Sequence, residues 1–361
     1  MLSVTGDATI SIEGDLADVQ RWFDERGMTD GLPIVPPTPE RVGAMLASVP
    51  DPAQTSLGLM MPRSGNVTLE KLAVNAVMAG ARPPYFRVIV AAVRAMLHPQ
   101  FNLYGINATT HPVAPLLIVH GPIARELEIC GGTGCLGPGF TANATIGRAL
   151  RLILMNVGGA HPGEGDRATH GGPAKFSYCM TENVADSPWP EFHTTRGFAA
   201  GEDAVTLYGG EAPHNIKDND STTPERLLEL TADVMRELGQ NSWYVAHENG
   251  RSESLVILCP EHAAIVAGAG FSRNDVAQFL LRRAVRPLRD LRAFGGMYRQ
   301  RDWAPWLLGL AESGDDVAIP LVRDAQDILI LVAGGAGKHS LFIPSFGPTF
   351  SVTVPVSETR P

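Results

Sequence analysis

The spacing of apolar positions divides the chain into a helical first part and a mixed remainder. Apolar residues recur at every third or fourth position in four early segments, DLADVQRWFDERG, TPERVGAMLASV, TLEKLAVNAVMAG and FRVIVAAVRAML, and this spacing predicts amphipathic helices. Thr38, which precedes a proline, and Thr68 stand where helix N-caps are expected. We therefore expect residues 1–110 to form a mainly helical N-terminal region.

From residue 111 onward, short apolar runs alternate with helical patterns. Strands are predicted at PLLIVHG, KFSYCMTEN, AVTLYGG, SLVILC, DILILVA, SLFIPSF and SVTVPV, and helices at TANATIGRALRLILMN, PERLLELTADVMRELG, EHAAIVAGA and SRNDVAQFLLRRAVRPL. This order predicts an α/β fold in which the helical N-terminal region is followed by a mixed or partly parallel sheet with flanking helices. The polar segment NIKDNDSTTPE ends in a third expected N-cap, Thr223. It separates a glycine-rich α/β core, residues 111–215, from a C-terminal α/β region with a glycine loop, residues 216–361.

Composition and charge exclude several classes of protein. With 44% apolar residues the chain of 361 can bury a core, so disorder is excluded. A formal net charge of −9 argues against nucleic acid or an anionic membrane as the main partner. The first residues carry acids without an apolar core, and no apolar run approaches the length of a membrane span. We expect a cytoplasmic protein with reduced thiols.

One stretch departs from the acidic average. Residues 282–301 contain a single acid, Asp290, and seven arginines, several of them at helical spacing: Arg282, Arg283, Arg286, Arg289, Arg292, Arg299 and Arg301. This pattern predicts an arginine-rich helix whose charged face is solvated or contacts another subunit, with a dedicated anion site as the alternative. It is the expected contact for a homo-oligomer or a protein partner.

Twelve of the 38 glycines lie between residues 131 and 172. The loop GGTGCLGPGF runs into a helix expected to begin near Ala142, and such a loop can present backbone N–H groups to an anion. Asn143, Thr145 and Arg148 are the expected substrate-binding residues there, although the glycines would equally suit a crowded turn. The loop contains a G-x-G-x-x-G match, but a poor strand precedes it and Pro138 interrupts the helix, so no nucleotide cofactor is predicted.

The segment HPGEGDRATHGG offers an alternative, metal-dependent chemistry. Imidazoles and carboxylates within ten residues suit zinc, iron or manganese, and His193 and His214 are candidate extra ligands. The four candidate ligands within the segment are His161, Glu164, Asp166 and His170. Their spacing is not H-E-x-x-H, and an exposed polar loop explains them as well.

The predicted strand FSYCMTEN carries a candidate nucleophile. Strand alternation places Cys179 on the same face as Ser177 and Thr181, a small polar side that we expect to lie outside the core. Glu182 and His193 follow within fifteen residues; a histidine can deprotonate a thiol, and a carboxylate can orient the histidine. The alternative is that Cys179 is a small buried apolar residue.

A second glycine-rich loop ends the strand DILILVA. Lys338, His339 and Ser340 follow its glycines, but Val332 stands where a phosphate-binding P-loop needs glycine. A lysine, an imidazole and a hydroxyl at the carboxyl end of a strand still form a candidate substrate corner. We predict Lys338 and Ser340 as substrate-binding residues and His339 as an acid or base, with a tight structural turn as the alternative.

Several segments together resemble the large bacterial family of UGSC-type (seleno)proteins. They are TDGLPIVPPTPERV, ATTHPVAP, ANATIGRALRLILMNVGGA, FSYCMTENVADSPW, LCPEHAA and VAGGAGKHSLFIPSFG. The resemblance covers nearly the whole chain and implies a cytoplasmic bacterial protein that acts on small molecules in catabolic or redox metabolism. The family's U-G-S-C motif does not occur in this sequence, but Cys130 and Cys135 flank the stretch CGGTGC, and a redox pair of these two is a further hypothesis.

These observations lead to three hypotheses of function. The first is an enzyme for a small anionic substrate, with redox or nucleophilic thiol chemistry at Cys179, assisted by Glu182, His193 and His339. The second is a metal-dependent hydrolase or lyase. The third is a non-catalytic subunit of a larger complex, with the arginine-rich helix as its partner surface.

Overall fold

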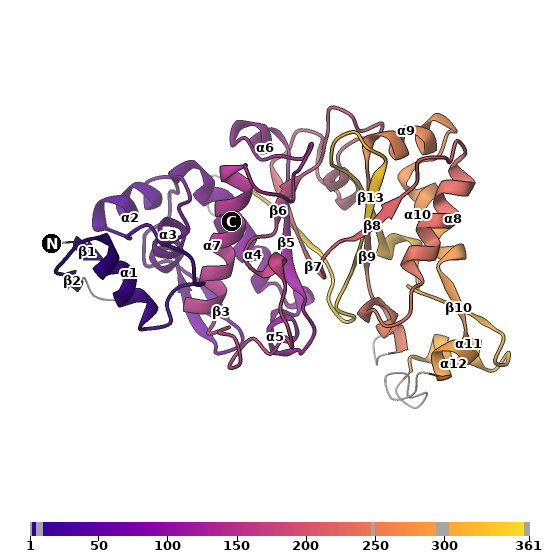
Figure 1. Cartoon of the computed structure of the whole chain (residues 1–361), viewed down its shortest axis with the longest axis horizontal. Coiled ribbons are helices and arrows are strands. Elements are labelled where there is room, and N and C mark those ends of the chain that lie inside the picture. Colours follow the sequence, from indigo (N-terminus) through magenta and orange to yellow (C-terminus); the bar gives the residue numbers. More distant parts are fainter. Residues whose placement is uncertain (1, 5–9, 247–249, 294–302, 357–361) are drawn as a thin grey trace.

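The protein is a four-layer arrangement of helices, two sheets and helices. The computed structural model describes residues 2–4, 10–246, 250–293 and 303–356. Two four-stranded sheets stand next to each other, one covered by the N-terminal helices and the other by the C-terminal helices (Figure 1). With 39% helix and 19% strand, the structure confirms the predicted α/β class. Among the helices of the described ranges, none has both the length and the apolarity that a membrane crossing requires.

The predicted elements occur in the predicted order, and several short elements were not predicted, among them four strands before residue 69 in the region expected to be mainly helical. The helices are α1 Leu16–Asp24, α2 Pro39–Leu46, α3 Leu69–Met78, α4 Phe86–Leu97, α5 Leu103–Ala108, α6 Pro122–Glu126, α7 Thr141–Asn156, α8 Pro224–Met235, α9 Pro260–Gly268, α10 Arg273–Arg283, α11 Leu288–Ala293 and α12 Pro305–Ala311. The strands are β1 Leu2–Val4, β2 Ile10–Ile12, β3 Ser56–Met60, β4 Gly65–Thr68, β5 Ala114–His120, β6 Cys179–Thr181, β7 Ala204–Gly210, β8 His214–Lys217, β9 Ser254–Leu258, β10 Val285–Pro287, β11 Ala318–Pro320, β12 Ile328–Val332, β13 His339–Pro344 and β14 Val352–Pro355. The side chains of Thr38, Thr68 and Thr223 accept hydrogen bonds from the first turns of α2, α3 and α8, which confirms the three predicted N-caps.

The first sheet has the strand order β14-β7-β5-β6, in which only β5 and β6 run parallel. Alternate residues of its strands enter different cores. Leu117 and Val119 of β5 belong to the core formed with α3, α4 and α7, whereas Leu116 and Ile118 belong to the core between the two sheets. The first sheet is therefore buried on both faces.

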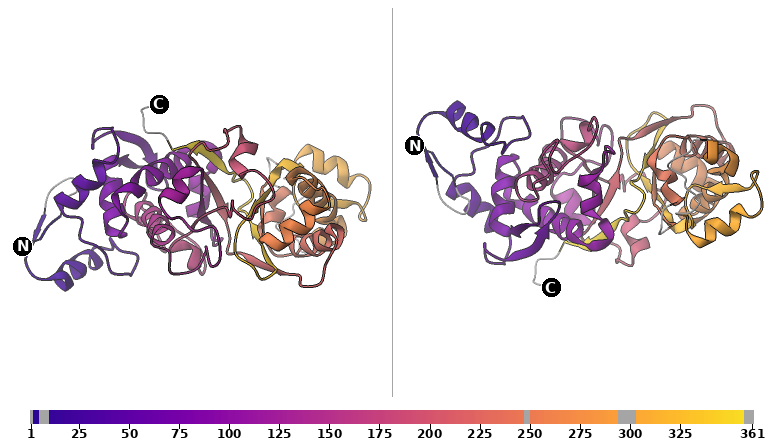
Figure 2. Two further views of the ribbon diagram at one scale, coloured as in Figure 1. Left: turned by 90° about the horizontal axis from the view of Figure 1, so that it is seen from above. Right: turned by 90° about the horizontal axis from the view of Figure 1, so that it is seen from below.

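The second sheet has the order β12-β9-β13-β8, with β12 and β9 parallel. Leu255 and Ile257 of β9 face the first sheet, while Val256 and Leu258 pack in the core with α8, α9 and α10. Burial on both faces explains why the central strands read as unbroken apolar runs rather than as alternating patterns. Figure 2 shows from above and below that the two halves lie along one axis, joined at the sheets.

The chain crosses between the two sheets more than once. The predicted boundary at residues 215 and 216 falls inside β8, which belongs to the second sheet. The last strand, β14, returns to the first sheet and pairs with β7. The C-terminal region is thus not spatially separate from the glycine-rich core.

The predicted arginine-rich helix is wrong. Helix α10 ends at Arg283, residues 285–287 form β10 against β11, and α11 then begins a new axis. Strand pairing outweighs helical spacing here because Pro287 interrupts an α-helix. Arg283 pairs with Glu229 at 3.0 Å, and Arg286 donates to the carbonyl of Arg236 at 2.7 Å. The last two arginines of the segment, Arg299 and Arg301, lie outside the described residues.

Candidate functional site

The two glycine-rich loops predicted from the sequence lie against each other. The N–H of Gly334, after β12, donates to the carbonyl of Gly131 at 2.8 Å. A Cβ atom on Gly335 would lie 1.8 Å from the Oγ1 of Thr133, so no larger residue fits at this position. The glycines there allow two loops to approach closely. This agrees with the alternative that they serve a crowded turn.

Asn143 holds the first of these loops in place. Its Oδ1 accepts from the N–H of Cys130 at 2.8 Å, and its Nδ2 lies 2.9–3.1 Å from the carbonyl oxygens of Cys130, Cys135 and Cys179. The side chain is buried, and its donor group is engaged by the backbone. Asn143 therefore orders the loop, and its amide offers a ligand no donor, contrary to the role expected from the sequence.

The other two expected binding residues on α7 also have structural partners. The hydroxyl of Thr145 donates to the carbonyl of Thr141 within the helix at 2.8 Å. Arg148 forms a two-pronged ion pair with Asp30, at 2.7 and 2.8 Å, and donates to the carbonyl of Pro33. Arg148 thus fixes the proline-rich segment before α2, and the structure gives no support to a substrate contact at either residue.

Cys179 lies in the apolar core, and the expectation that it lies outside is wrong. It is 3% exposed, and it packs in the core with α3, α4 and α7. The alternation holds within β6, where Cys179 and Met180 enter different cores, but Phe176 and Ser177 lie before the strand, and both faces of the sheet are covered. Burial raises the pKa of the Cys179 thiol far above its usual value. A neutral, enclosed thiol is a poor nucleophile.

Glu182 and His193 do come together, in a buried cluster completed by His120 and Arg273. Glu182 accepts from Arg273 at 2.8 Å and from the N–H of Phe192 at 2.6 Å, and it lies 3.4 Å from His120. The rings of His120 and His193 stack with centroids 5.1 Å apart. His120 and Arg273 were not predicted to belong here, because they are distant from Glu182 in the chain and no local pattern links them to it.

The chemistry of this cluster is that of an internal ion pair. Burial alone would raise the pKa of Glu182, but the contact with His120 and the charge of Arg273 hold it below its usual value. Burial and the neighbouring His120 lower the pKa of His193. The side chains of His120 and Glu182 are at most 1% exposed. The cluster joins the loop after β6 to helix α10; Glu182, His120 and His193 are buried, and Arg273 lines a cavity of about 240 Å³ on its other side.

Each of the three residues after the second glycine loop has its own hydrogen-bond partner, and none of these partners is in the cluster of Glu182. Lys338 donates to the carbonyl of Asn219 at 2.7 Å, and the Nδ1 of His339 lies 2.8 Å from the Oδ1 of Asn215 at the exposed start of β13. Ser340 is 1% exposed and lies 2.7 Å from the Nδ1 of His262, whose Nε2 faces the carbonyl of Asp218. Because that carbonyl can only accept, the Nε2 of His262 carries a proton, and in the neutral imidazole the Ser340 hydroxyl donates to Nδ1. This pair is also enclosed.

The four residues of the metal alternative do not form a metal site in the described part of the chain. No group of three or more His, Cys, Asp or Glu side chains there is placed to hold a metal ion. Glu164 points to Arg63 at the surface, at 2.6 Å. Asp166 instead pairs with two cations. The loop that carries these residues nevertheless borders a cavity.

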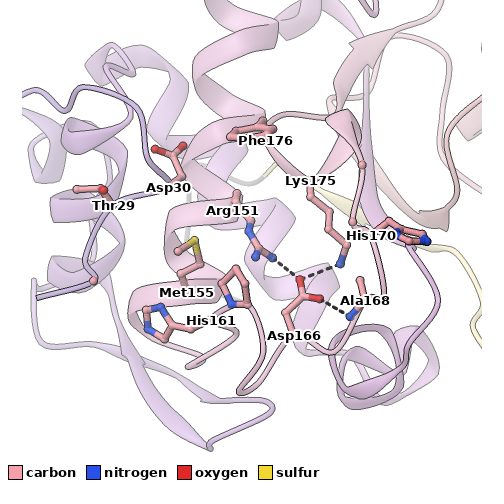
Figure 3. Close-up of a pocket in the computed structure, with 14 residues that line it drawn as sticks. Thr29, Asp30, Arg151, Met155, His161, Asp166, Ala168, His170, Lys175 and Phe176 are labelled. Carbon is pink, nitrogen blue, oxygen red and sulfur yellow. Dashed lines mark hydrogen bonds and ion pairs between the residues drawn. The ribbon is translucent and has the colours of Figure 1, made fainter. Parts of the chain in front are cut away.

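That cavity has a volume of about 410 Å³. It lies between the segment before α2, the helix α7 and the glycine-rich loop of residues 161–176 (Figure 3). The residues that line it are Gly27, Thr29, Asp30, Arg151, Met155, His161, Pro162, Asp166, Ala168, His170, Gly171, Gly172, Lys175 and Phe176. Neither Cys179 nor any of its expected assistants is among them.

Three charged side chains meet at the inner wall of the pocket. The Oδ2 of Asp166 accepts from the Nη1 of Arg151 at 3.0 Å and from the Nζ of Lys175 at 2.8 Å. Its Oδ1 accepts from the N–H of Ala168 at 3.1 Å. Figure 3 shows Arg151 and Lys175 reaching the carboxylate from different elements, α7 and the short 3-10 helix of residues 173–175.

The local backbone positions Asp166 next to Arg151 and Lys175. The carbonyl of His161 accepts from the N–H groups of Glu164, Gly165 and Asp166, which closes a tight turn. A Cβ atom on Gly165 would lie 2.1 Å from the carbonyl oxygen of Gly159, so the turn requires glycine there. Glycine in this loop thus allows two backbone segments to approach closely, and the resulting turn places the Asp166 carboxylate beside α7.

The pKa values in the pocket follow from burial and from this pairing. Burial would raise the pKa of Asp166, but the hydrogen bond and the charge of Lys175 hold it below its usual value. Burial lowers the pKa of Lys175, and the charge of Arg151 acts in the same direction, against the attraction of Asp166. The side chains of Lys175 and Asp166 are 12% and 4% exposed.

One carboxylate faces two cations, so the inner wall carries a formal surplus of one positive charge. Asp30, the other acid of the pocket, is neutralised by Arg148. Met155, Pro162, Ala168 and Phe176 supply apolar walls. Apolar walls with a few convergent polar groups are typical of small-molecule sites.

The polar residues of this loop were predicted as a candidate site, but Arg151 and Lys175 were not. Arg151 is separated from Asp166 by fifteen residues, and the helical pattern of α7 alone cannot show which of its arginines faces a loop. Lys175 had a usable signal, since it is one of four lysines in the chain and follows a glycine pair.

Comparisons of the chain with protein-family models, with curated proteins and with solved structures find no match. The resemblance to UGSC-type (seleno)proteins therefore stays a prediction.

Proposed function

We propose that the protein is an enzyme acting on a small organic anion, which binds in the pocket between α7 and the loop of residues 161–176. The observation that carries this proposal is that Arg151 and Lys175 share a single carboxylate oxygen of Asp166. Two cations that are 11% and 12% exposed and share one counter-ion favour a second anion. A ligand carboxylate beside Asp166 would supply it.

The residues have distinct roles in this proposal. Arg151 provides a planar guanidinium, which suits a carboxylate better than a point charge does. Lys175 is both a second contact for the anion and a group that can exchange a proton with the substrate, because its pKa is lowered by burial. His161 and His170 line the same pocket as further polar groups.

The first prediction concerns affinity for small carboxylates. Oxalate and succinate should bind to the wild-type chain, and their amides should bind much more weakly. Replacing Arg151→Met should weaken oxalate binding by about tenfold to a hundredfold, because a hydrogen bond to a charged group contributes about 1.5–3 kcal/mol. Asp166 keeps Lys175 as a partner in this variant, so we expect it to fold. Calorimetric titration measures the dissociation constants.

The matched control is Arg125→Met, which removes an exposed arginine at the end of α6. It should leave the affinity unchanged. Equal loss of oxalate binding in both variants would show that net charge, rather than this pocket, attracts the anion. Binding of the amides as tight as that of the acids would contradict the proposal outright.

A further inference from the structure

We propose that the substrates of the pocket are 2-oxo acids and that Lys175 forms an imine with their carbonyl carbon. This inference rests on the proposed function. The Nζ of Lys175 and the Nη1 of Arg151 lie side by side, since both bind the Oδ2 of Asp166, at 2.8 and 3.0 Å. In a 2-oxo acid the carboxylate carbon is bonded directly to the carbonyl carbon. A carboxylate held by Arg151 therefore brings the carbonyl carbon to the neighbouring amine.

The surroundings of Lys175 suit a nucleophilic amine. Its side chain is 12% exposed and lines the pocket together with Met155, Ala168 and Phe176. A lysine becomes a better nucleophile when it is desolvated or lies beside a second cation, because both conditions favour the neutral amine. Arg151 supplies that second cation, and the lowered pKa of Lys175 agrees with this geometry.

The reaction balances without an oxidant or a reductant. The unprotonated form of the Lys175 amine attacks the carbonyl carbon, a C–N bond forms, and the carbonyl electron pair moves to oxygen, which takes up a proton from solvent. Asp166, 2.8 Å from the nitrogen, accepts the proton that the nitrogen loses and returns it to the hydroxyl group. The hydroxyl leaves as water, and loss of the remaining N–H proton to solvent, which balances the proton taken up earlier, gives a neutral imine. One ketone and one amine thus yield one imine and one water.

The chain contains its own controls for this chemistry. Its four lysines are Lys71, Lys175, Lys217 and Lys338. Lys217 lies exposed on β8, away from the residues that line the pocket. An imine that forms only because lysine is generally reactive would appear on Lys217 at least as readily as on Lys175.

The experiment is reductive trapping of the full chain with pyruvate and cyanoborohydride, followed by digestion and mass spectrometry. We expect the reduced adduct on Lys175 to exceed that on Lys217 by about tenfold or more, because a carboxylate held by Arg151 keeps the carbonyl carbon next to the Lys175 amine. Propanone, which has the ketone but no carboxylate, should lose this preference. The Arg151→Met variant should lose it as well, and the Arg125→Met variant should retain it.

Equal amounts of the reduced pyruvate adduct on Lys175 and Lys217 would contradict the proposed imine. If pyruvate binds in calorimetric titration in an Arg151-dependent manner but leaves Lys175 unmodified, the imine is wrong and the proposed function stands. If pyruvate and oxalate both fail to bind, the proposed function fails as well.

Discussion

Replacing Asp166→Asn is expected to lower the free energy of unfolding by about 3–5 kcal/mol, the usual cost of removing one partner from a buried ion pair. The substitution leaves Arg151 and Lys175 next to each other without their shared carboxylate. Added oxalate should then restore part of the stability by mass action, because it binds the folded state in place of the lost carboxylate. Urea unfolding with and without oxalate measures both effects.

The control is Glu164→Gln, two residues away in the same loop. Glu164 pairs with Arg63, but both side chains are about 60% exposed, so we expect a loss below about 1 kcal/mol. Similar losses for the two variants would mean that the interactions around Asp166 are screened like those of a surface pair. If Asp166→Asn lowers the free energy of unfolding and oxalate restores none of it, the cluster of Asp166, Arg151 and Lys175 has a structural role only.

The second large effect is expected for Asn143→Leu, which has a similar side-chain volume. The change leaves the N–H of Cys130 without its partner, and it removes the donor that faces three buried carbonyl groups. Each unsatisfied buried polar group costs about 1–3 kcal/mol, so we expect a loss of at least about 3 kcal/mol. Urea unfolding measures it.

Asn66→Ala serves as the comparison for that variant. Asn66 is exposed on β4 and accepts a single side-chain hydrogen bond, from Ser56. Its loss should change the stability by less than about 0.5 kcal/mol. A loss of that small size for Asn143→Leu would contradict the structural role assigned to the Asn143 amide.

Much of the fold was predictable from the sequence because local rules agree with the tertiary structure. Helix α7 spans the predicted TANATIGRALRLILMN in full, and the caps at Thr38, Thr68 and Thr223 lie where expected. The arginine-rich segment failed because strand pairing at β10 outweighed its helical spacing. The prediction that Cys179 lies outside the core was wrong for another reason. Alternation identifies the two faces of a strand, but it does not show that helices cover one face and a second sheet covers the other.

The candidate site was predictable only as a region. The cluster of glycines and polar residues between 161 and 172 marked the loop correctly, because tight turns next to a cavity need both residue types. The pairing of its carboxylate was not predictable. Asp166 was expected beside other metal ligands, whereas the structure places it against Arg151 and Lys175 from two other elements. Such pairing depends on tertiary contacts that periodicity does not encode.

The most direct test of the central claim is whether an anion occupies the space beside Lys175. The acetylation rate of each of the four lysines should be measured by mass spectrometry with and without saturating oxalate. Oxalate should slow the acetylation of Lys175 and leave that of the exposed Lys217 unchanged. An unchanged rate at Lys175, at an oxalate concentration that saturates binding in calorimetric titration, would show that the anion binds elsewhere and would contradict the account.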